Sequence, residues 1–489
     1  MRRAILMVAV GASVSLATSA LGQTVPVIID LGTLGGTESY TSAPPQALTA
    51  TGRVLTETGQ VVGTSTLADG SLHAFSWTQA GGMVDLGTLG GGRSEASAAS
   101  DGGQVVGASA LADGSSHAFS WTQAGGMVDL GTLGGTNSHA SAVNESGQVV
   151  GESWMPPDDL YAHSHAFLWT QEDGMTDLGA LRNPESLNVK DSAGATAIND
   201  AGQVIGISGW YTEYHVFFWD SGNMIDLIPQ YGGYSGASSV NESGQVVGWT
   251  WWGHWTSRPF SWTRESGFID LGTLPGGWLS EASAVNDSGQ VVGWSMTGPG
   301  YPDTGPRHAF SWTQDGGMID LGTLAGMESS EARAVNDRGQ VVGTGTSSDG
   351  SVRAFSWTQA GGMIDLGALG GGRSEAFAIN ESGQIAGESQ LADGSWHAVL
   401  WKTDPVAEIE LLVQTIDRMA LPFGTQTSLE RKLAAANAAL AAGDIPAACE
   451  VLASFRDSVS AQSEKRITRD QSQDLVAFAA DVHDMLQCP

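Results

Sequence analysis

A repeated block of sequence constrains this chain more than any other feature. Each copy contains variants of Asp-Leu-Gly, Ala-Val-Asn, Gly-Gln-Val-Val-Gly and His-Ala-Phe-Ser-Trp, in that order. A period of about 40–50 residues with four apolar runs per copy is typical of β-propeller blades. The copies end at eight tryptophans spaced 43 to 50 residues apart, which we expect in the core: Trp77, Trp121, Trp169, Trp219, Trp262, Trp312, Trp357 and Trp401.

The copy that begins at Asp129 illustrates the strands we expect. They cover 127–130, 140–143, 149–153 and 165–169, where β-branched and aromatic residues gather between Gly, Asn and Ser. Asn-Glu-Ser-Gly joins the second run to the third, with Asn opening a type I turn and Gly supplying the left-handed residue. A second tight, Gly-rich connection joins each repeat tryptophan to the next Asp-Leu. The four strands of a blade therefore run from Ala-Val-Asn to Met-Val-Asp-Leu.

The two ends of the repeat array predict how the ring closes. The last copy ends at Trp401 without an Asp-Leu strand, whereas a spare one at 27–31 precedes the first copy. We predict an all-β, eight-bladed β-propeller of four-stranded blades, closed by pairing of this N-terminal strand with residues 399–401. Closure leaves no exposed sheet ends. The alternative is an open stack whose blades run from Asp-Leu to Trp, which would split a tight hairpin between two blades.

Three segments recur in fixed order over about residues 27–401: Asp-Leu-Gly-Thr-Leu-Gly-Gly, Asn-(Asp/Glu)-Ser-Gly-Gln-Val-Val-Gly and His-Ala-Phe-Ser-Trp. They resemble the HAF family of extracellular repeats found in bacterial exported proteins. The resemblance implies export and a repeat fold. It implies no established activity.

We expect three segments: a signal peptide at 1–22, the propeller at 23–403 and an α-helical domain at 404–489. Arg2 and Arg3 precede an apolar run at 5–16, and small residues follow it, so cleavage is expected after Ala20 or Gly22. Later apolar runs stay shorter than the roughly 18 residues that a membrane-spanning helix needs. The sequence therefore predicts a secreted protein, extracellular or periplasmic.

Apolar residues at helical spacing predict four short amphipathic helices after residue 404, packed as a small bundle. Expected helix caps are Asp404, Thr427, Asp444 and Thr468. Cys449 and Cys488 are the two cysteines of the chain and should pair in an oxidising compartment. Such a bridge would stabilise the segment by roughly 3–4 kcal/mol.

This segment, about 409–488, resembles the FIMAH-type helical module found at the C-terminus of diverse bacterial exported proteins. The resemblance includes Leu-Pro-Phe-Gly-Thr, Ser-Leu-Glu-Arg-Lys-Leu and Ala-Ala-Cys. It implies a docking or display unit with a partner of unknown kind. A spacer without a partner is the alternative.

Strand direction separates the connections of each copy onto two faces. The two tight hairpins must share one face, here named the constant face. The connections between the second and third strands, and those between copies, share the other, here named the variable face. From the repeat glycine to the repeat phenylalanine the chain advances 12 residues at Gly63–Phe75 but 17 at Gly293–Phe310. Loops on a rigid scaffold commonly carry function.

Tryptophans outside the repeat positions lie toward the variable face and are densest at 249–255. Aromatic planes there suit stacking against sugar rings or capture of an apolar group. The alternative is that they fill gaps between blades. The predicted ligand-binding residues are Trp154, Trp210, Tyr211, Tyr214, Trp249, Trp251, Trp252, Trp255, Trp278 and Trp294.

Charge and motif content exclude several functions. A net charge of −31 repels phosphate backbones and argues against nucleic-acid binding. A histidine or arginine recurs once per copy, which spreads these residues too widely to share a metal ion, so we expect each to pair with an acidic neighbour such as the repeat aspartate. These residues are His73, His117, His165, His215, His308 and His397, with Arg258 and Arg353 in two copies. We predict no catalytic residue, metal site or cofactor.

The sequence favours a secreted, non-catalytic protein that binds a carbohydrate or cell-surface ligand through its variable face. One alternative is an extracellular enzyme acting on a polysaccharide, which would use unrepeated acids on that face. Its candidate acids are Asp158, Asp159, Glu185, Asp191 and Glu213. A purely structural surface protein is the third hypothesis.

Overall fold

The structure is a computed structural model that describes residues 26–41, 53–156, 163–181, 191–210, 213–229, 233–251, 256–298, 305–403, 405–419, 421–486 and 488. The predicted signal peptide and the expected cap Asp404 lie outside these ranges. Within them, no helix has the length and apolar character needed to cross a membrane.

The repeat region forms six four-stranded sheets and one eight-stranded sheet. The eight-stranded sheet contains two antiparallel runs of four, which one parallel pair, Leu72 with Arg93, joins. Its strands are β2 (Gly35–Tyr40), β3 (Val61–Leu67), β4 (Leu72–Thr78) and β5 (Gly82–Asp85), then β6 (Gly90–Ala99), β7 (Val105–Leu111), β8 (Ser116–Thr122) and β9 (Gly126–Asp129).

Five of the four-stranded sheets are consecutive antiparallel meanders. Their strands are β10 (Ser138–Val143), β11 (Val149–Trp154), β12 (Ser164–Thr170) and β13 (Gly174–Gly179); β14 (Ser192–Ile198), β15 (Val204–Trp210), β16 (Glu213–Asp220) and β17 (Asn223–Asp226); β18 (Ser235–Val240), β19 (Val246–Trp251), β20 (Ser257–Thr263) and β21 (Gly267–Asp270); β22 (Ser280–Val285), β23 (Val291–Met296), β24 (Arg307–Thr313) and β25 (Gly317–Asp320); and β26 (Ser329–Val335), β27 (Val341–Thr346), β28 (Val352–Thr358) and β29 (Gly362–Asp365).

The sixth four-stranded sheet joins the two ends of the repeat region. It has the order β1-β32-β31-β30, where β1 (Val27–Asp30) comes from the N-terminal end and β30 (Gly370–Ile379), β31 (Ile385–Leu391) and β32 (Trp396–Lys402) from the last copy. In the antiparallel register Ile28 faces Trp401 and Asp30 faces Val399. The predicted pairing of the spare N-terminal strand with the last copy is therefore confirmed.

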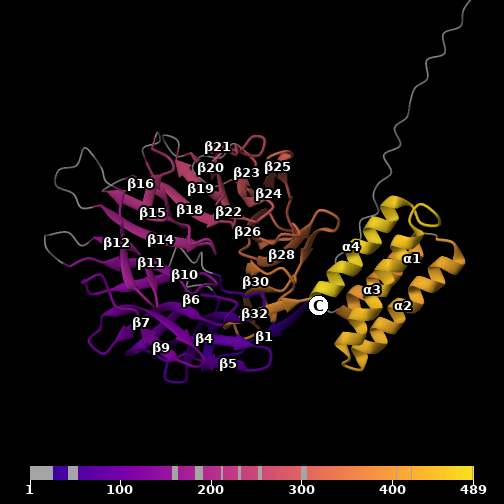
Figure 1. Cartoon of the computed structure of the whole chain (residues 1–489), viewed down its shortest axis with the longest axis horizontal. Coiled ribbons are helices and arrows are strands. Elements are labelled where there is room, and N and C mark those ends of the chain that lie inside the picture. The colour runs from indigo at the N-terminus through magenta and orange to yellow at the C-terminus, as the bar shows by residue number, and fades with distance from the viewer. Residues whose placement is uncertain are drawn as a thin grey trace, which may run out of the picture.

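The sheets follow one another around a central axis, with the first strand of each copy on the inside and the last on the outside (Figure 1). Neighbouring first strands such as β10, β14 and β18 contact one another, and β2 contacts β32, which brings the start of the array against its end. This arrangement is a β-propeller, as the repeat length predicts.

Apolar clusters fill the spaces between consecutive sheets. The repeat phenylalanine, for example Phe119 or Phe310, is completely buried in each copy that has one. One cluster joins Ala386 and Leu400 of the last copy to Val61 and Phe75 of the first. Each Å² of apolar surface that these clusters bury stabilises the fold by about 25 cal/mol, and this burial is the main force that holds the sheets together.

The repeat tryptophans are less uniformly buried than expected. Trp77, Trp262 and Trp401 are buried, whereas the other five are half-buried. In the last copy Val399 takes the place of the phenylalanine. In the other seven copies the tryptophan comes two residues after the phenylalanine, next to the hairpin that leads to the outermost strand, as Trp121 does opposite Met127. The intersheet cluster opens toward solvent at this point, so the phenylalanine carries the deeper contact.

The Asn-Glu-Ser-Gly turn forms as predicted. In the copy at 144–148, the Asn144 N–H donates to the Gln148 carbonyl at 3.1 Å, and the Gly147 N–H donates to the Asn144 carbonyl at 3.0 Å. Gly147 has a φ of 80°, in the left-handed region that glycine adopts without steric cost.

The constant face is held by a closed circuit of hydrogen bonds between neighbouring copies. In each, the backbone N–H of an acidic turn residue donates to the carboxylate of the corresponding residue in the next copy, at 2.6–3.0 Å. The circuit runs through Glu57, Asp101, Glu145, Asp200, Glu242, Asp287, Asp337 and Glu381, then back to Glu57. We call this set the carboxylate ring.

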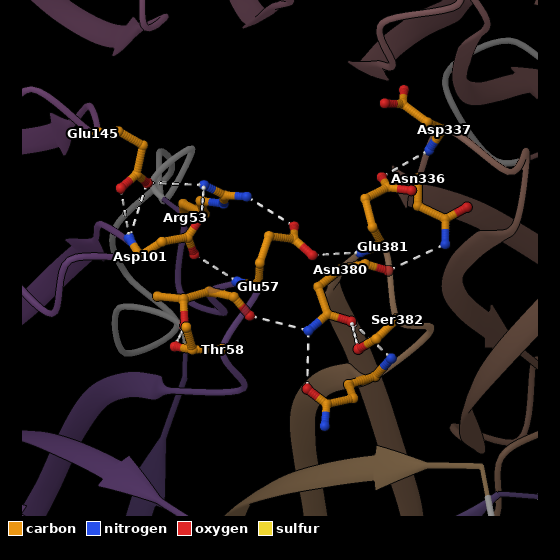
Figure 2. Close-up of polar contacts among 12 residues, drawn as sticks. Arg53, Glu57, Thr58, Asp101, Glu145, Asn336, Asp337, Asn380, Glu381 and Ser382 are labelled. Atoms are coloured by element: carbon orange, nitrogen blue, oxygen red, sulfur yellow. Dashed lines mark hydrogen bonds and ion pairs between the residues drawn. The ribbon is translucent and has the colours of Figure 1, made fainter. Parts of the chain in front are cut away.

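A second set of contacts lies beneath the carboxylate ring. The buried turn asparagine in six copies donates its Nδ2 to the carbonyl of the next turn, at 2.8–3.1 Å. Asn336 donates to the Asn380 carbonyl (Figure 2), and Asn380 in turn donates to the Thr56 carbonyl near the start of the array. Thr56 and Ser100 occupy the asparagine position in the first two copies.

Arg53 supplies positive charge to the carboxylate ring. Its guanidinium forms ion pairs with Glu57 at 2.8 Å, Asp101 at 3.3 Å and Glu145 at 3.2 Å (Figure 2). One cation therefore contacts three consecutive members of the ring and offsets part of their mutual repulsion.

The described residues of the C-terminal region form four helices that share one apolar core. They are α1 (Pro405–Arg418), α2 (Phe423–Ala441), α3 (Ile445–Gln462) and α4 (Arg469–Met485). Fully buried Leu412, Leu433, Leu452 and Leu475 supply one core residue from each helix. The predicted disulfide between Cys449 and Cys488 is present, with the two Cα atoms 5.6 Å apart.

Two of the expected helix caps form and one does not. Asp444 accepts from the Ala447 N–H at 3.1 Å, and Thr468 exchanges reciprocal hydrogen bonds with Gln471. The predicted cap at Thr427 is wrong because α2 begins earlier, immediately after Pro422. The fixed φ of proline suits a helix start, which places Thr427 inside the helix.

Candidate functional site

Sequence differences between copies concentrate at two facing positions near the variable face. One lies on the first strand of each sheet and the other opposite it on the second strand. The pairs include His139 opposite Glu152, Gly236 opposite Trp249, and Glu281 opposite Trp294. Phenylalanine and valine positions deeper in the same sheets hardly change. The variable face is therefore chemically different from one copy to the next.

A pocket of about 450 Å³ opens between the strand pairs β6–β7 and β10–β11. This volume falls within the range of about 300–1,000 Å³ that is common for ligand sites. Its polar and aromatic lining includes Arg93, Glu95, Asn137, His139, Glu152 and Trp154. The Trp154 ring is 44% exposed at the end of β11, so one face of the pocket is an accessible aromatic surface.

Hydrogen bonds orient the polar groups of the Trp154 pocket. Arg93 forms an ion pair with Glu95, and Asn137 Oδ1 accepts from the Ser116 N–H at 2.9 Å. His139 Nε2 lies 3.2 Å from Ser97 Oγ. Burial lowers the pKa of His139 despite the opposing effect of Glu152 and Glu95, so the imidazole is neutral at neutral pH.

A row of three aromatic rings lies on the same face, two sheets further along the chain. Tyr214 of β16 stacks on Tyr234 with ring centroids 5.5 Å apart, and Tyr234 contacts Trp251 of β19 at 5.3 Å. Tyr214 is 39% exposed and Tyr234 is 40% exposed. We call these three residues the aromatic row. The planes of Tyr214 and Tyr234 lie 28° apart and the Trp251 plane is tilted 59° from Tyr234, so the exposed parts of these rings form an angled aromatic surface that a sugar or another ring can contact.

Other predicted tryptophans pack inside the molecule. Trp294 is buried, and the Arg307 guanidinium lies 4.1 Å from its ring centroid while pairing with Glu331. Trp249 lies against Gly236, where a Cβ would approach its ring to 2.7 Å. Trp278 is half-buried. The protein therefore covers these rings more than it covers the Trp154 ring.

The described residues include only part of the predicted site. Tyr211, Trp252 and Trp255 lie outside them, as do Asp158, Asp159 and Glu185. Trp210 ends β15, without a described side chain. Asp191 precedes β14 and Glu213 begins β16, at separate points of one sheet.

Sequence reasoning missed Tyr234 and the polar lining of the Trp154 pocket. Tyr234 lies in the glycine-rich sequence Tyr-Gly-Gly-Tyr-Ser-Gly, which is typical of a connection between strands and contains no tryptophan to mark it. Glu95, His139 and Glu152 could have been found by aligning the copies, because they occupy the facing positions whose residue type changes between copies.

The repeat histidines pair with the repeat aspartates, as predicted. Six His Nδ1–Asp carboxylate contacts of 2.7–2.9 Å join the third strand of a sheet to the outermost one. One of them, His397 with Asp30, crosses the closure of the ring. Arg258 replaces histidine opposite Asp270 at 3.6 Å. Among the described residues, no group of three or more histidine, cysteine or acidic side chains could hold a metal ion.

No protein-family model and no curated protein matches the chain. Similar solved structures include the beta-propeller domain of the Trilobed protease from Pyrococcus furiosus, at 12% identity and a TM-score of 0.41 over 68% of this chain and 98% of that one. Acylaminoacyl peptidase from Pyrococcus horikoshii has 7% identity and a TM-score of 0.41, over 72% of this chain and 58% of that one. BP39L lectin from Burkholderia pseudomallei has 12% identity and a TM-score of 0.32, over 60% and 94%. Similarity at this level carries no argument about function.

Proposed function

We propose that this chain is an exported, non-catalytic binding protein whose aromatic row recognises a carbohydrate, either free or on a cell surface. In this proposal the repeats form an eight-bladed HAF-type propeller, and the C-terminal helices form a four-helix bundle of the FIMAH type.

Two observations support eight blades. The eight-stranded sheet divides into two runs of four that share a single parallel pair, so each run corresponds to one blade. The carboxylate ring also passes once through each of eight turns before it returns to its start.

The aromatic row is the observation that carries the binding proposal. Tyr214 and Tyr234 stack on each other and still expose about two fifths of their surface. Both rings end in a hydroxyl that can donate to or accept from a sugar hydroxyl. Stacking with a few polar contacts is how rigid aromatic surfaces bind ligands at low cost in conformational entropy.

A glycan array probed with the full chain tests this proposal, followed by calorimetry with the best glycan. The variant with Tyr214→Ala and Tyr234→Ala together should weaken binding at least about tenfold, the effect of losing roughly 1.4 kcal/mol or more. Phe423→Ala is the matched control, because it removes an aromatic ring that is 85% exposed in the helical region.

The outcomes separate three functions. Loss of binding in the double variant with an unchanged control supports the proposal. Breakdown of an array glycan by the wild-type chain would instead support an enzyme that acts on polysaccharide. An array without any bound glycan, from folded protein, would contradict carbohydrate recognition and favour a structural role.

A further inference from the structure

The charges inside the Trp154 pocket do not cancel. Arg93 is already paired with Glu95, so these two side chains neutralise each other. Among the described residues, the Glu152 carboxylate accepts one hydrogen bond, from Ser164 Oγ at 3.4 Å, which is long and involves a neutral donor. His139, opposite Glu152 in the register, is neutral at neutral pH. Among the residues that the structure describes, the pocket therefore holds a carboxylate without a cationic partner.

The next sheet fixes the position of this carboxylate. Glu152 lies close against Gly194, where a Cβ would approach Glu152 Oε2 to 3.2 Å, and the open volume beside Glu152 is the pocket itself. The Trp154 ring forms a neighbouring wall of the same pocket. A carboxylate next to an accessible tryptophan face combines an ion-pair acceptor with a surface that attracts both sugar rings and cations.

We propose that the Trp154 pocket binds the protonated amine of an amino sugar, with the sugar ring stacked on Trp154 and the ammonium group donating to Glu152. This inference adds a second site, with a named ligand class, to the proposed carbohydrate-binding function, and it rests on that function. The acidic chain as a whole favours the same ligand, because a net charge of −31 attracts cationic glycans and repels anionic ones.

An ammonium ligand fits this pocket better than a neutral hexose or an acidic sugar. A neutral ring would leave the Glu152 charge partly desolvated without compensation, and an acidic ring would add repulsion. Asn137 and the Arg93–Glu95 pair remain available at the pocket wall for sugar hydroxyls.

The test compares glucosamine oligomers with N-acetylglucosamine oligomers of equal length, measured by calorimetry on the full chain. Wild type should bind the glucosamine oligomer more tightly. Glu152→Gln, which keeps the shape and removes the charge, should weaken glucosamine binding at least about tenfold and leave the acetylated oligomer unaffected. Glu388→Gln is the matched control, because Glu388 occupies the same repeat position opposite Glu375 in another sheet.

Trp154→Ala serves as the second variant, since this exposed ring can be removed without disturbing the core. It should weaken both oligomers by removing the stacking surface. Equal affinity of wild type for the two oligomers, or an unchanged amine preference in Glu152→Gln, would overturn the inference. The Tyr214→Ala, Tyr234→Ala variant assayed in parallel reports on the aromatic row, so failure of the pocket is distinguished from failure of carbohydrate binding.

Discussion

The constant and variable faces of the propeller are made by the same repeat, yet they use it in opposite ways. On the constant face one contact recurs at every turn, a backbone N–H donating to the carboxylate of the next copy. On the variable face the facing positions hold His139 with Glu152 in one sheet and Glu281 with Trp294 in another. Repetition on one face leaves the other free to diverge.

The difference also shows how an acidic chain uses its charge. On the constant face, carboxylates satisfy turn N–H groups of the neighbouring sheet, and Arg53 offsets part of their repulsion. In the Trp154 pocket, the Glu152 carboxylate accepts one hydrogen bond among the described residues, from the Ser164 hydroxyl. The first arrangement completes hydrogen bonds within the protein, whereas the second leaves an acceptor open to a ligand.

Breaking one link of the constant face should produce the largest loss of stability. Asn286 is buried, donates to the Asn336 carbonyl at 2.8 Å and accepts from the Gln290 N–H at 2.8 Å. Asn286→Ala leaves the buried turn N–H of Gln290 without its acceptor and removes one of the two donors to the Asn336 carbonyl, which keeps the Gly339 N–H at 3.0 Å. We expect the free energy of unfolding to fall by about 2–3 kcal/mol. Urea unfolding monitored by tryptophan fluorescence measures this. The partly exposed Asn137 of the variable face is the control, and an equal loss for Asn137→Ala would contradict the contrast between the faces.

Removing the cation of the carboxylate ring should have an intermediate effect. Arg53→Met keeps much of the side-chain volume but leaves three carboxylates without their ion-pair partner. We expect a loss of about 1–2 kcal/mol, because the partly exposed network is screened by solvent, and a smaller loss at high salt. Urea unfolding at two ionic strengths measures both. The control is Arg264→Met, which breaks the exposed ion pair with Asp220 on the outer hairpins and should change stability much less. A loss of stability in Arg53→Met that does not depend on salt would argue against an electrostatic role.

The carboxylate ring should also give a small pH dependence with a defined sign. Burial and the nearby Asp200 and Asp287 raise the pKa of Glu242, although Arg53 acts in the opposite direction. The folded state therefore holds this proton more firmly than the unfolded state, and the resulting stability is present at acid pH and lost as pH rises through the raised pKa.

Glu242→Gln cannot ionise and can still accept the Asp200 N–H through its carbonyl oxygen. The variant should match wild type at acid pH and exceed it at neutral pH, by less than about 1 kcal/mol because the group is well exposed. Unfolding of both proteins across this pH range gives the difference. The exposed Glu265→Gln is the control, and a variant less stable than wild type at neutral pH would reverse the proposed sign.

The aromatic row should show the smallest effect on stability. The variant with Tyr214→Ala and Tyr234→Ala removes two rings that lie at the surface, so its unfolding free energy should stay within about 0.5 kcal/mol of wild type. Thermal and urea unfolding check this before any binding assay. A loss comparable to that of Asn286→Ala would mean that these rings support the fold, and it would remove the contrast on which the binding proposal depends.

Much of the fold could be predicted because the same turn and strand motifs recur in each copy of the repeat. The Asn-Gly turns, the His–Asp pairs and the spare strand at 27–31 each follow from residue type and spacing. Single occurrences were harder to predict. Thr427 lies in a sequence typical of a helix cap, but the helix begins earlier, after Pro422. Tyr234 became a candidate binding residue only because the fold places it beside Tyr214 and Trp251.

The sequence by itself determined the strands, their order within each sheet and the pairing that closes the ring, because these depend on hairpins and hydrogen bonds between residues with a regular pattern. Only the tertiary structure decided which carboxylate serves the fold and which faces a pocket. Glu57 bonds to a turn more than three hundred residues away in sequence, and Glu152 shares its pocket with Arg93 of the preceding sheet. Such neighbours come together only when the sheets pack against one another, since local spacing carries no information about contacts between sheets.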